Sequence, residues 1–298
     1  MTRLLYMSTM MALCLGFVLQ PSTMTATERI PVFVSIVPQK YFLERLGGDH
    51  VTVSVMVRPG NNPALYEPKP NQMVALSKTR TYFAVGVPFE KVWLKKIAST
   101  NPQMQIVHTE KGIAKRSMKK HHHKQKSEGL NTSDSTIKDP HIWLSPPLVM
   151  VQARNIMRAL VDIDPENATS YLSNYRNFIA EIVDLDTEIY RIFSTKGTGF
   201  SFMVFHPAWG YFAEAYGLNQ LPIEFEGKEP KPAQMKQLIT SARKHQTKVI
   251  FVQPQFSKKS AETIARAIGA KVVFADPLHP DWAMNLRTQA ANIKAAMR

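Results

Sequence analysis

The segment DPENATSYLSNYRNFIAEIVDLDTEIYRIF, residues 164–193, carries the strongest helical pattern in the chain. From residue 168 to residue 192 its apolar side chains recur at steps of three and four, apart from adjacent Tyr171 and Leu172. This is the spacing of one buried face of a helix. A helix over 165–193 would be about 40 Å long, at about 1.5 Å per residue, and the glycines at 197 and 199 predict its end. A helix of this length can run along both halves of a molecule.

On both sides of this helix, short apolar runs alternate with segments of helical pattern. Before it, we expect strands at 32–37, 51–57, 82–85 and 105–108, and helices at 39–46, 70–77, 89–99 and 145–163. After it, we expect strands at 202–205, 220–224, 249–252 and 272–275, and helices at 208–216, 232–245, 258–268 and 281–296. Such alternation is typical of α/β layers with a parallel sheet. We therefore predict an α/β fold with two similar lobes, each with a parallel sheet flanked by helices, joined by one long backbone helix.

The first residues of the chain are typical of an export signal. Arg3 precedes an uncharged apolar run at 4–19, and small polar residues lead to a plausible cleavage point near Ala26. The run is short for a membrane span, although a retained anchor is the alternative. Leu13 is too bulky for a lipoprotein signal at Cys14, the only cysteine, so we expect no lipid anchor and a mature chain without cysteine. The chain thus divides into a signal peptide at 1–26, an N-terminal lobe at 27–164, a linking helix at 165–195 and a C-terminal lobe at 196–298.

A polar insert at 111–138 interrupts the pattern of the first lobe. It holds eight Lys and Arg residues against two acids, with the run KKHHHK at 119–124 near its centre. We expect a mobile surface loop here, because the segment cannot bury enough apolar area to offset the entropy of ordering. The formal charge of the whole chain is +14, and this insert carries much of it. Because no aromatic residues are interleaved with these charges and the chain is exported, we expect no nucleic-acid partner.

Three side chains could meet at the carboxyl ends of the predicted strands, where open parallel sheets bind ligands. His206 follows the strand at 202–205, Asp276 follows the strand at 272–275, and His141 lies between the insert and the next helix. Two imidazoles and a carboxylate suit zinc, which accepts nitrogen and oxygen ligands in a four-coordinate shell. The alternatives are ordinary: a single loop histidine is often a surface or capping residue, and an aspartate before proline often forms a turn. Spacing alone does not decide between these readings.

Five motifs resemble the zinc and manganese substrate-binding proteins of ABC importers, the ZnuA-like cluster A-I family. They are RPGNNPALYEPKP at 58–70, DPHIWLSP at 139–146, FHPAWGYFAEAYGL at 205–218, IEFEGKEPKPAQM at 223–235 and VVFADPL at 272–278. The resemblance covers nearly all of the chain from Ile30 onward. It implies two lobes beside a rigid helix with the metal in the cleft between them. It also implies that His141 and His206 match the family's second and third histidine ligands and that Asp276 matches its acidic ligand.

One departure from the family pattern concerns the first ligand. Ala64 stands where the family has a histidine, so a fourth place is open to water, to a histidine of the insert or to Glu67. His108, at the end of a predicted strand, is a further candidate. The insert histidines His121, His122 and His123 resemble the histidine-rich loop of zinc-selective members, which implies low-affinity zinc capture. The alternative is a solvated loop without a metal.

The resemblance implies a function in transport. We expect a periplasmic substrate-binding protein that captures a divalent transition metal, zinc rather than manganese, as transported ligand and delivers it to the permease and ATPase of an ABC importer. We expect a monomer and no enzymatic activity. One alternative is an exported zinc-dependent hydrolase with a three-ligand site, although the sequence has no HExxH and no Gly-x-Ser-x-Gly motif. The other is a surface adhesin or zinc-storage protein on the same scaffold.

Overall fold

Two four-stranded parallel sheets form the framework of the molecule. A computed structural model describes residues 28–118, 138–194, 199–225 and 227–297. The predicted signal peptide at 1–26 and the histidines His121, His122 and His123 therefore lie outside the described residues.

The N-terminal sheet has the strand order β2-β1-β3-β4, with all neighbours parallel. Its strands are β1 (Ile30–Val34), β2 (Val51–Val55), β3 (Thr81–Ala84) and β4 (Gln105–His108). Its helices are α1 (Val37–Gly47), α2 (Pro70–Leu76) and α3 (Pro88–Thr100), with a short 3-10 turn at Gly48–His50. Each of the three α-helices has proline in its first turn, where the missing N–H costs no hydrogen bond.

The C-terminal sheet repeats this plan with the order β6-β5-β7-β8, again all parallel. Its strands are β5 (Ser201–Val204), β6 (Asn219–Pro222), β7 (Val249–Val252) and β8 (Lys271–Phe274). Its helices are α6 (Gly210–Ala215), α7 (Pro232–Lys244), α8 (Lys259–Ile268) and α9 (Trp282–Ala296). Every residue of β3, β5 and β7 is buried, as expected for strands covered on both faces. The predicted fold class is confirmed.

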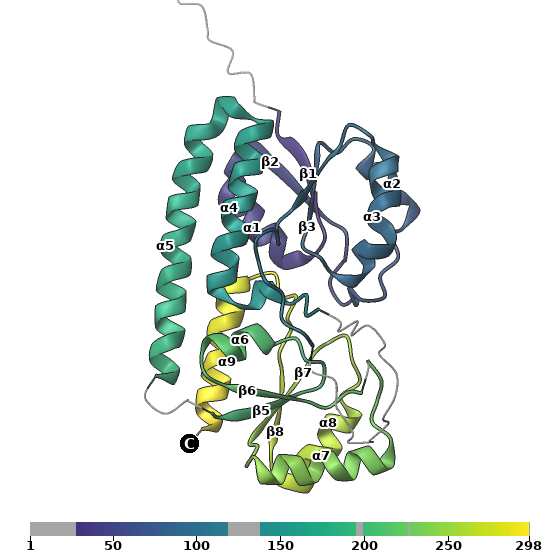
Figure 1. Ribbon diagram of the computed structural model, residues 1–298, viewed down its shortest axis with the longest axis vertical. Coiled ribbons are helices and arrows are strands. Elements are labelled where there is room, and N and C mark those ends of the chain that lie inside the picture. The colour runs from purple at the N-terminus through teal and green to yellow at the C-terminus, as the bar shows by residue number, and fades with distance from the viewer. Residues whose placement is uncertain (1–27, 119–137, 195–198, 226, 298) are drawn as a thin grey trace, which may run out of the picture.

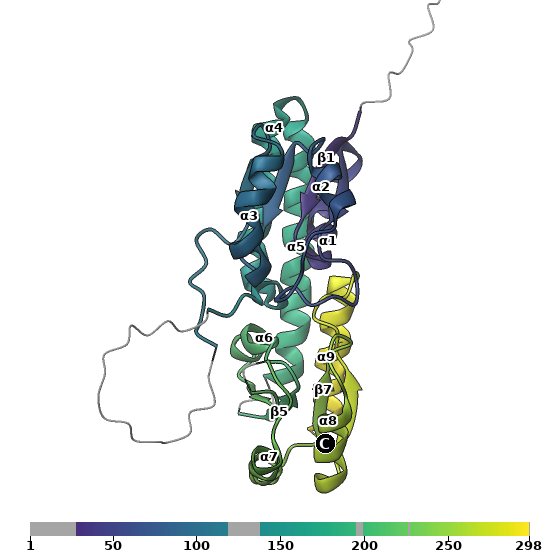
Figure 2. The same ribbon diagram turned by 90° about the vertical axis from the view of Figure 1, so that its right-hand side faces the viewer.

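The long helix α5 (Ala168–Phe193) runs beside both lobes (Figure 1). Figure 2, which views the molecule from the side opposite α5, shows it running behind the upper lobe and continuing down past α6 and α9. Most of its buried residues fall on the predicted stripe, namely Tyr171, Phe178, Ile182, Leu185 and Ile189, and Phe193 extends it by one residue. Leu172, which the prediction included, is 44% exposed. The α-helix starts at Ala168 rather than at 165, because Pro165–Asn167 forms a 3-10 turn. Asn167 Nδ2, at the end of that turn, and Tyr171 Oη, in α5, both donate to Asp164 Oδ2, at 2.9 and 2.6 Å.

One hydrophobic core spans the two lobes. Helix α4 (Pro146–Ile163) packs on α5, and α9 packs on α5 from the other lobe. Trp282, at the start of α9, is 2% exposed and lies edge-on to Phe42 of α1, with ring centroids 5.2 Å apart. Its Nε1 donates to the carbonyl of Trp143 at 2.6 Å, and Trp143 Nε1 donates to the carbonyl of Pro277 at 2.7 Å. These two tryptophans therefore join the lobes through both packing and hydrogen bonds.

The prediction of a mobile loop over the whole insert 111–138 is too broad. Residues 111–118 are described, and Ser117 pairs with Lys138 in an isolated antiparallel bridge. The Lys115 ammonium donates to two backbone carbonyls, and Arg116 contacts the other lobe. Because these cationic groups find buried or partly buried partners, the contacts offset the entropy of ordering that composition alone suggests.

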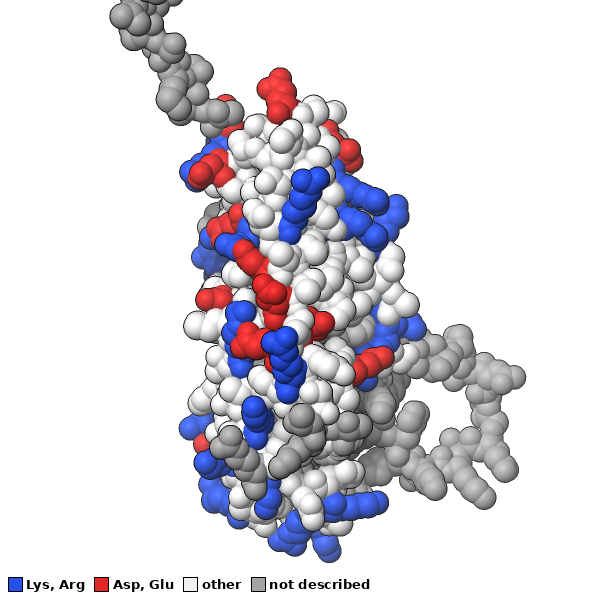
Figure 3. Space-filling model, turned by 90° about the vertical axis from the view of Figure 1, so that its left-hand side faces the viewer, with Lys and Arg blue, Asp and Glu red and all other residues white. Residues whose placement is uncertain are grey.

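Positive charge also gathers at the far end of the C-terminal lobe (Figure 3). Residues 231–271, which include α7 and α8, hold nine Lys and Arg residues and a single acid, Glu262. That acid pairs with Lys258 at 3.0 Å. The basic excess of the chain therefore has a second location besides the insert. Within the described ranges, no helix combines the length and the apolar character that crossing a bilayer requires.

Candidate metal centre

His206 lies just beyond the carboxyl end of β5, a central strand of its sheet. Gln253, which follows β7, fixes its backbone from both sides: the N–H of His206 donates to Gln253 Oε1 at 3.1 Å, and Gln253 Nε2 donates to the His206 carbonyl at 2.7 Å. Nδ1 of the ring lies 2.9 Å from Glu224 Oε1. The ring also stacks on Phe256, with centroids 5.2 Å apart. The backbone and the ring of His206 are thus both held.

His141 enters from the connection between the lobes. It directly precedes the 3-10 turn Ile142–Leu144 and is 8% exposed. Its backbone N–H and its Nδ1 both contact Asp139 Oδ1, at 3.0 and 2.7 Å. Burial lowers the pKa of His141, and the hydrogen bond and charge of Asp139 oppose this in part. The neutral imidazole is the form that binds metal, so this environment favours ligation.

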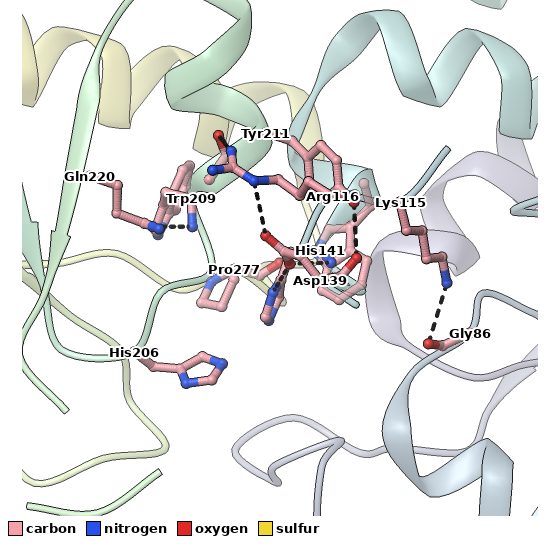
Figure 4. Close-up of polar contacts among 12 residues, drawn as sticks. Gly86, Lys115, Arg116, Asp139, His141, His206, Trp209, Tyr211, Gln220 and Pro277 are labelled. Carbon is pink, nitrogen blue, oxygen red and sulfur yellow. Dashed lines mark hydrogen bonds and ion pairs between the residues drawn. The ribbon is translucent and has the colours of Figure 1, made fainter. Parts of the chain in front are cut away.

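The structure brings these two histidines together. Their ring centroids are 5.2 Å apart and their planes are inclined at 68°. In each ring Nδ1 faces a carboxylate, which favours the tautomer that leaves Nε2 unprotonated. Figure 4 shows the two rings near each other, each reaching in from its own segment of the chain. The geometry supplies two oriented imidazole donors, which suit a cation such as zinc.

Asp276 lies in the turn after β8, one residue beyond Ala275. Its Oδ1 accepts from Gln255 Nε2 at 3.2 Å and from the N–H of Leu278 at 2.9 Å. Its carbonyl accepts from Asn285 Nδ2 at 2.8 Å. The turn-forming role considered from the sequence is therefore present. Within the part of the chain that the structure describes, no three His, Cys, Asp or Glu side chains are grouped closely enough to hold an ion. The role of Asp276 as a third ligand stays a prediction.

The other candidate positions lie outside this histidine pair. Ala64 and Glu67 are exposed in the loop between β2 and α2, where the Ala64 N–H donates to Asn62 Oδ1 at 2.8 Å. His108, at the end of β4, has its Nδ1 3.1 Å from Glu110 Oε1. His108 and Glu110 both line a separate pocket of about 330 Å³. The structure thus gives His108 a partner other than the histidine pair.

Two carboxylates that contact the histidine rings are not among the site residues predicted from the sequence. Asp139 stands two residues before His141 in the DPH motif, and that short spacing was an available signal. Glu224 lies in the IEFEG motif, two residues after the end of β6, but it is 18 positions from His206. Its Oε2 is buried and has no hydrogen-bond partner among the described residues. Each carboxylate contacts Nδ1 of a histidine ring, and for Glu224 no sequence spacing indicates this contact.

Known proteins resemble this chain over most of its length. A family model described as the periplasmic zinc-uptake complex component A, ZnuA, matches residues 32–296. The high-affinity zinc uptake system protein ZnuA of Bacillus subtilis (strain 168) is 30% identical over 248 residues, which are 82% of this chain and 77% of that protein.

Solved structures of ZnuA also superpose on this fold. One crystal structure has a TM-score of 0.84 and 43% identity, over 91% of this chain and all of the other. A ZnuA deletion mutant with zinc bound has a TM-score of 0.81 and 42% identity, over 90% of this chain and 98% of the other.

Proposed function

Because the chain belongs to the ZnuA family of periplasmic zinc-uptake components, we propose that it captures zinc between its lobes and delivers it to an ABC importer. The observation that carries this proposal is the pair His141 and His206, with ring centroids 5.2 Å apart and a carboxylate behind each ring. The zinc is cargo, so binding has to be reversible and needs no bond-making step. We accordingly assign no enzymatic activity.

The proposed coordination uses Nε2 of each histidine and one carboxylate. Nitrogen donors favour zinc over manganese, which prefers an oxygen-rich shell. Asp276 is the proposed third ligand. A water, Glu67 or a histidine of the insert (His121, His122 or His123) completes the shell where the family's first histidine is replaced by Ala64.

The proposed partners follow from how the two lobes contribute. His206 belongs to the C-terminal lobe and His141 to the connection that leaves the N-terminal lobe, so one ion held by both links the halves of the molecule. A permease can then distinguish loaded from empty protein by the arrangement of the lobes, since a ligand shifts an equilibrium only through contacts that differ between the two states. The partners are the permease and its ATPase, the location is the periplasm after removal of residues 1–26, and the protein acts as a monomer.

Metal analysis and competition titration test this function directly. The mature chain, purified without a tag, should contain zinc. His141→Ala and His206→Ala should each lose most of the affinity, and Asp276→Ala should weaken it. His245→Ala is the matched control, because this exposed histidine caps α7 and its ring nitrogen Nδ1 contacts Ser241, far from the histidine pair in the sequence. Wild-type stoichiometry and affinity in all three site variants would refute the assigned site.

A further inference from the structure

Two neighbouring residues near the start of the insert form hydrogen bonds with different lobes. Lys115 Nζ donates to the carbonyls of Val85 and Gly86, at 3.0 and 3.4 Å, just beyond the end of β3. The next residue, Arg116, reaches the C-terminal lobe: its backbone N–H donates to Tyr211 Oη at 2.9 Å, and its guanidinium donates to the carbonyl of Gly210. We call Lys115 and Arg116 the strap. Figure 4 shows its two side chains pointing to different lobes.

The strap also contacts the carboxylate that orients His141. The N–H of Asp139 donates to the carbonyl of Arg116 at 2.9 Å, and Tyr211 Oη donates to the carbonyl of Asp139 at 3.0 Å. Arg116 Nε lies 3.9 Å from Asp139 Oδ2, while Oδ1 of the same carboxylate faces His141. One buried carboxylate, 2% exposed, therefore stands between the guanidinium and the imidazole.

Close packing at α6 supports the same arrangement. A Cβ atom added to Gly210 would lie 3.0 Å from both Arg116 Nη1 and Asp139 Oδ2. The absence of a side chain at Gly210 thus lets the guanidinium and the carboxylate approach α6 together. The second ion pair of Arg116, with Glu214 at 3.2 Å, differs because the Glu214 side chain is 69% exposed. Exposed pairs contribute little, so the contacts with Asp139 and α6 matter more.

We infer that Arg116 is a positioning residue for zinc: it fixes Asp139, and through it the His141 ring, against the lobe that carries His206. This inference rests on the proposed function. A guanidinium is a rigid fork that can bind a carboxylate and a carbonyl at once, which a flexible ammonium does only partly. Groups behind a metal-binding histidine set its orientation, and losing such a group typically costs about 10–100-fold in affinity.

Zinc competition titration of Arg116→Met and Arg116→Lys tests the inference. We expect Arg116→Met to weaken binding by about 10-fold or more with unchanged stoichiometry, and Arg116→Lys to recover part of the loss. Arg158→Met is the matched control, because Arg158 is exposed on α4, and it should bind as the wild type does. Thermal unfolding of the metal-free variants reports whether a loss comes from the fold instead.

A double-mutant cycle with Asp139→Asn separates positioning from a general structural effect. If Arg116 acts through Asp139, Arg116→Met should add little in the Asp139→Asn background, because contacting residues are not additive. Equal losses in both backgrounds would overturn the inference, and so would wild-type affinity in Arg116→Met. A wild-type chain that binds no zinc would instead overturn the proposed function. Should Arg116→Met fail to fold, Arg116→Lys carries the same cycle.

Discussion

The two lobes have the same strand order but place different chemistry at the same positions. In the N-terminal lobe the N–H groups of Met56 and Val57 donate to the carbonyls of Val34 and Ser35. In the C-terminal lobe the corresponding donors are Ile223 and Glu224, and the acceptors are Val204 and Phe205. By this register Val57 corresponds to Glu224, and Ile36 corresponds to His206.

The difference shows that the shared strand order places residues at equivalent strand ends, and that the side chains at those ends determine whether a lobe can bind a metal there. The C-terminal lobe places a histidine and its carboxylate at the ends of β5 and β6. The N-terminal lobe fills the equivalent positions with buried Ile36 and Val57. Its imidazole, His141, comes instead from the chain after the insert. One half of the proposed site is therefore built on strand ends, and the other half depends on a connection that other groups must hold in place.

The largest effect we expect concerns whether the lobes fold as one unit. Trp282→Ala removes a buried ring that packs on Phe42 of the other lobe, and should destabilise the protein by about 3–5 kcal/mol in urea unfolding. Met284→Ala is the control, because Met284 is 52% exposed on the same helix. Two separate unfolding transitions, with only one shifted by Trp282→Ala, would show that the two lobes unfold independently.

The next largest effect concerns zinc affinity at the equivalent positions Glu224 and Val57. Glu224→Gln removes the negative charge beside His206 Nδ1 and should weaken zinc binding by about 10–100-fold in competition titration. Val57→Ala, at the equivalent buried position, should lower the free energy of unfolding and leave zinc affinity unchanged. Comparable zinc losses in both variants would mean that the Glu224 effect arises from packing rather than from the His206 ring.

The sequence predicts the fold more completely than the site. The strands predicted at 105–108 and 249–252 match the bounds of β4 and β7. Other boundaries shift because hydrogen bonds with neighbouring strands set the strand ends. The proximity of His141 to His206 could not be derived from spacing and was implied only by the family resemblance. The contact of Arg116 with Tyr211 joins residues 95 positions apart, and although Tyr211 lies in the motif at 205–218, nothing in the sequence pairs it with Arg116.

A smaller effect distinguishes the acids that follow the outer strands. The N–H of Thr109 donates to Ala84 and that of Ala275 to Val252, so Glu110 corresponds to Asp276. Asp276→Asn keeps the oxygen that accepts from Leu278 and removes the charge, so it should weaken zinc binding about tenfold, or about 1.4 kcal/mol. Glu110→Gln should not change zinc affinity, because Glu110 contacts His108. A titration in which Glu110→Gln is the weaker binder would reverse this assignment.

The smallest effect should come from giving the N-terminal lobe a ligand of its own. Ala64 lies in the loop that follows β2, the strand equivalent to β6, and its side chain is exposed. Ala64→His adds a third imidazole and should tighten zinc binding a few-fold, because the loop must first lose conformational freedom to bring the ring to the ion. Leu65→His is the matched control: Leu65 is 82% exposed, and an imidazole there should leave affinity unchanged. Equal affinities of Ala64→His and the wild type in competition titration would mean that the loop cannot reach the ion. The site would then depend on the strand ends of one lobe and the connection held by Arg116.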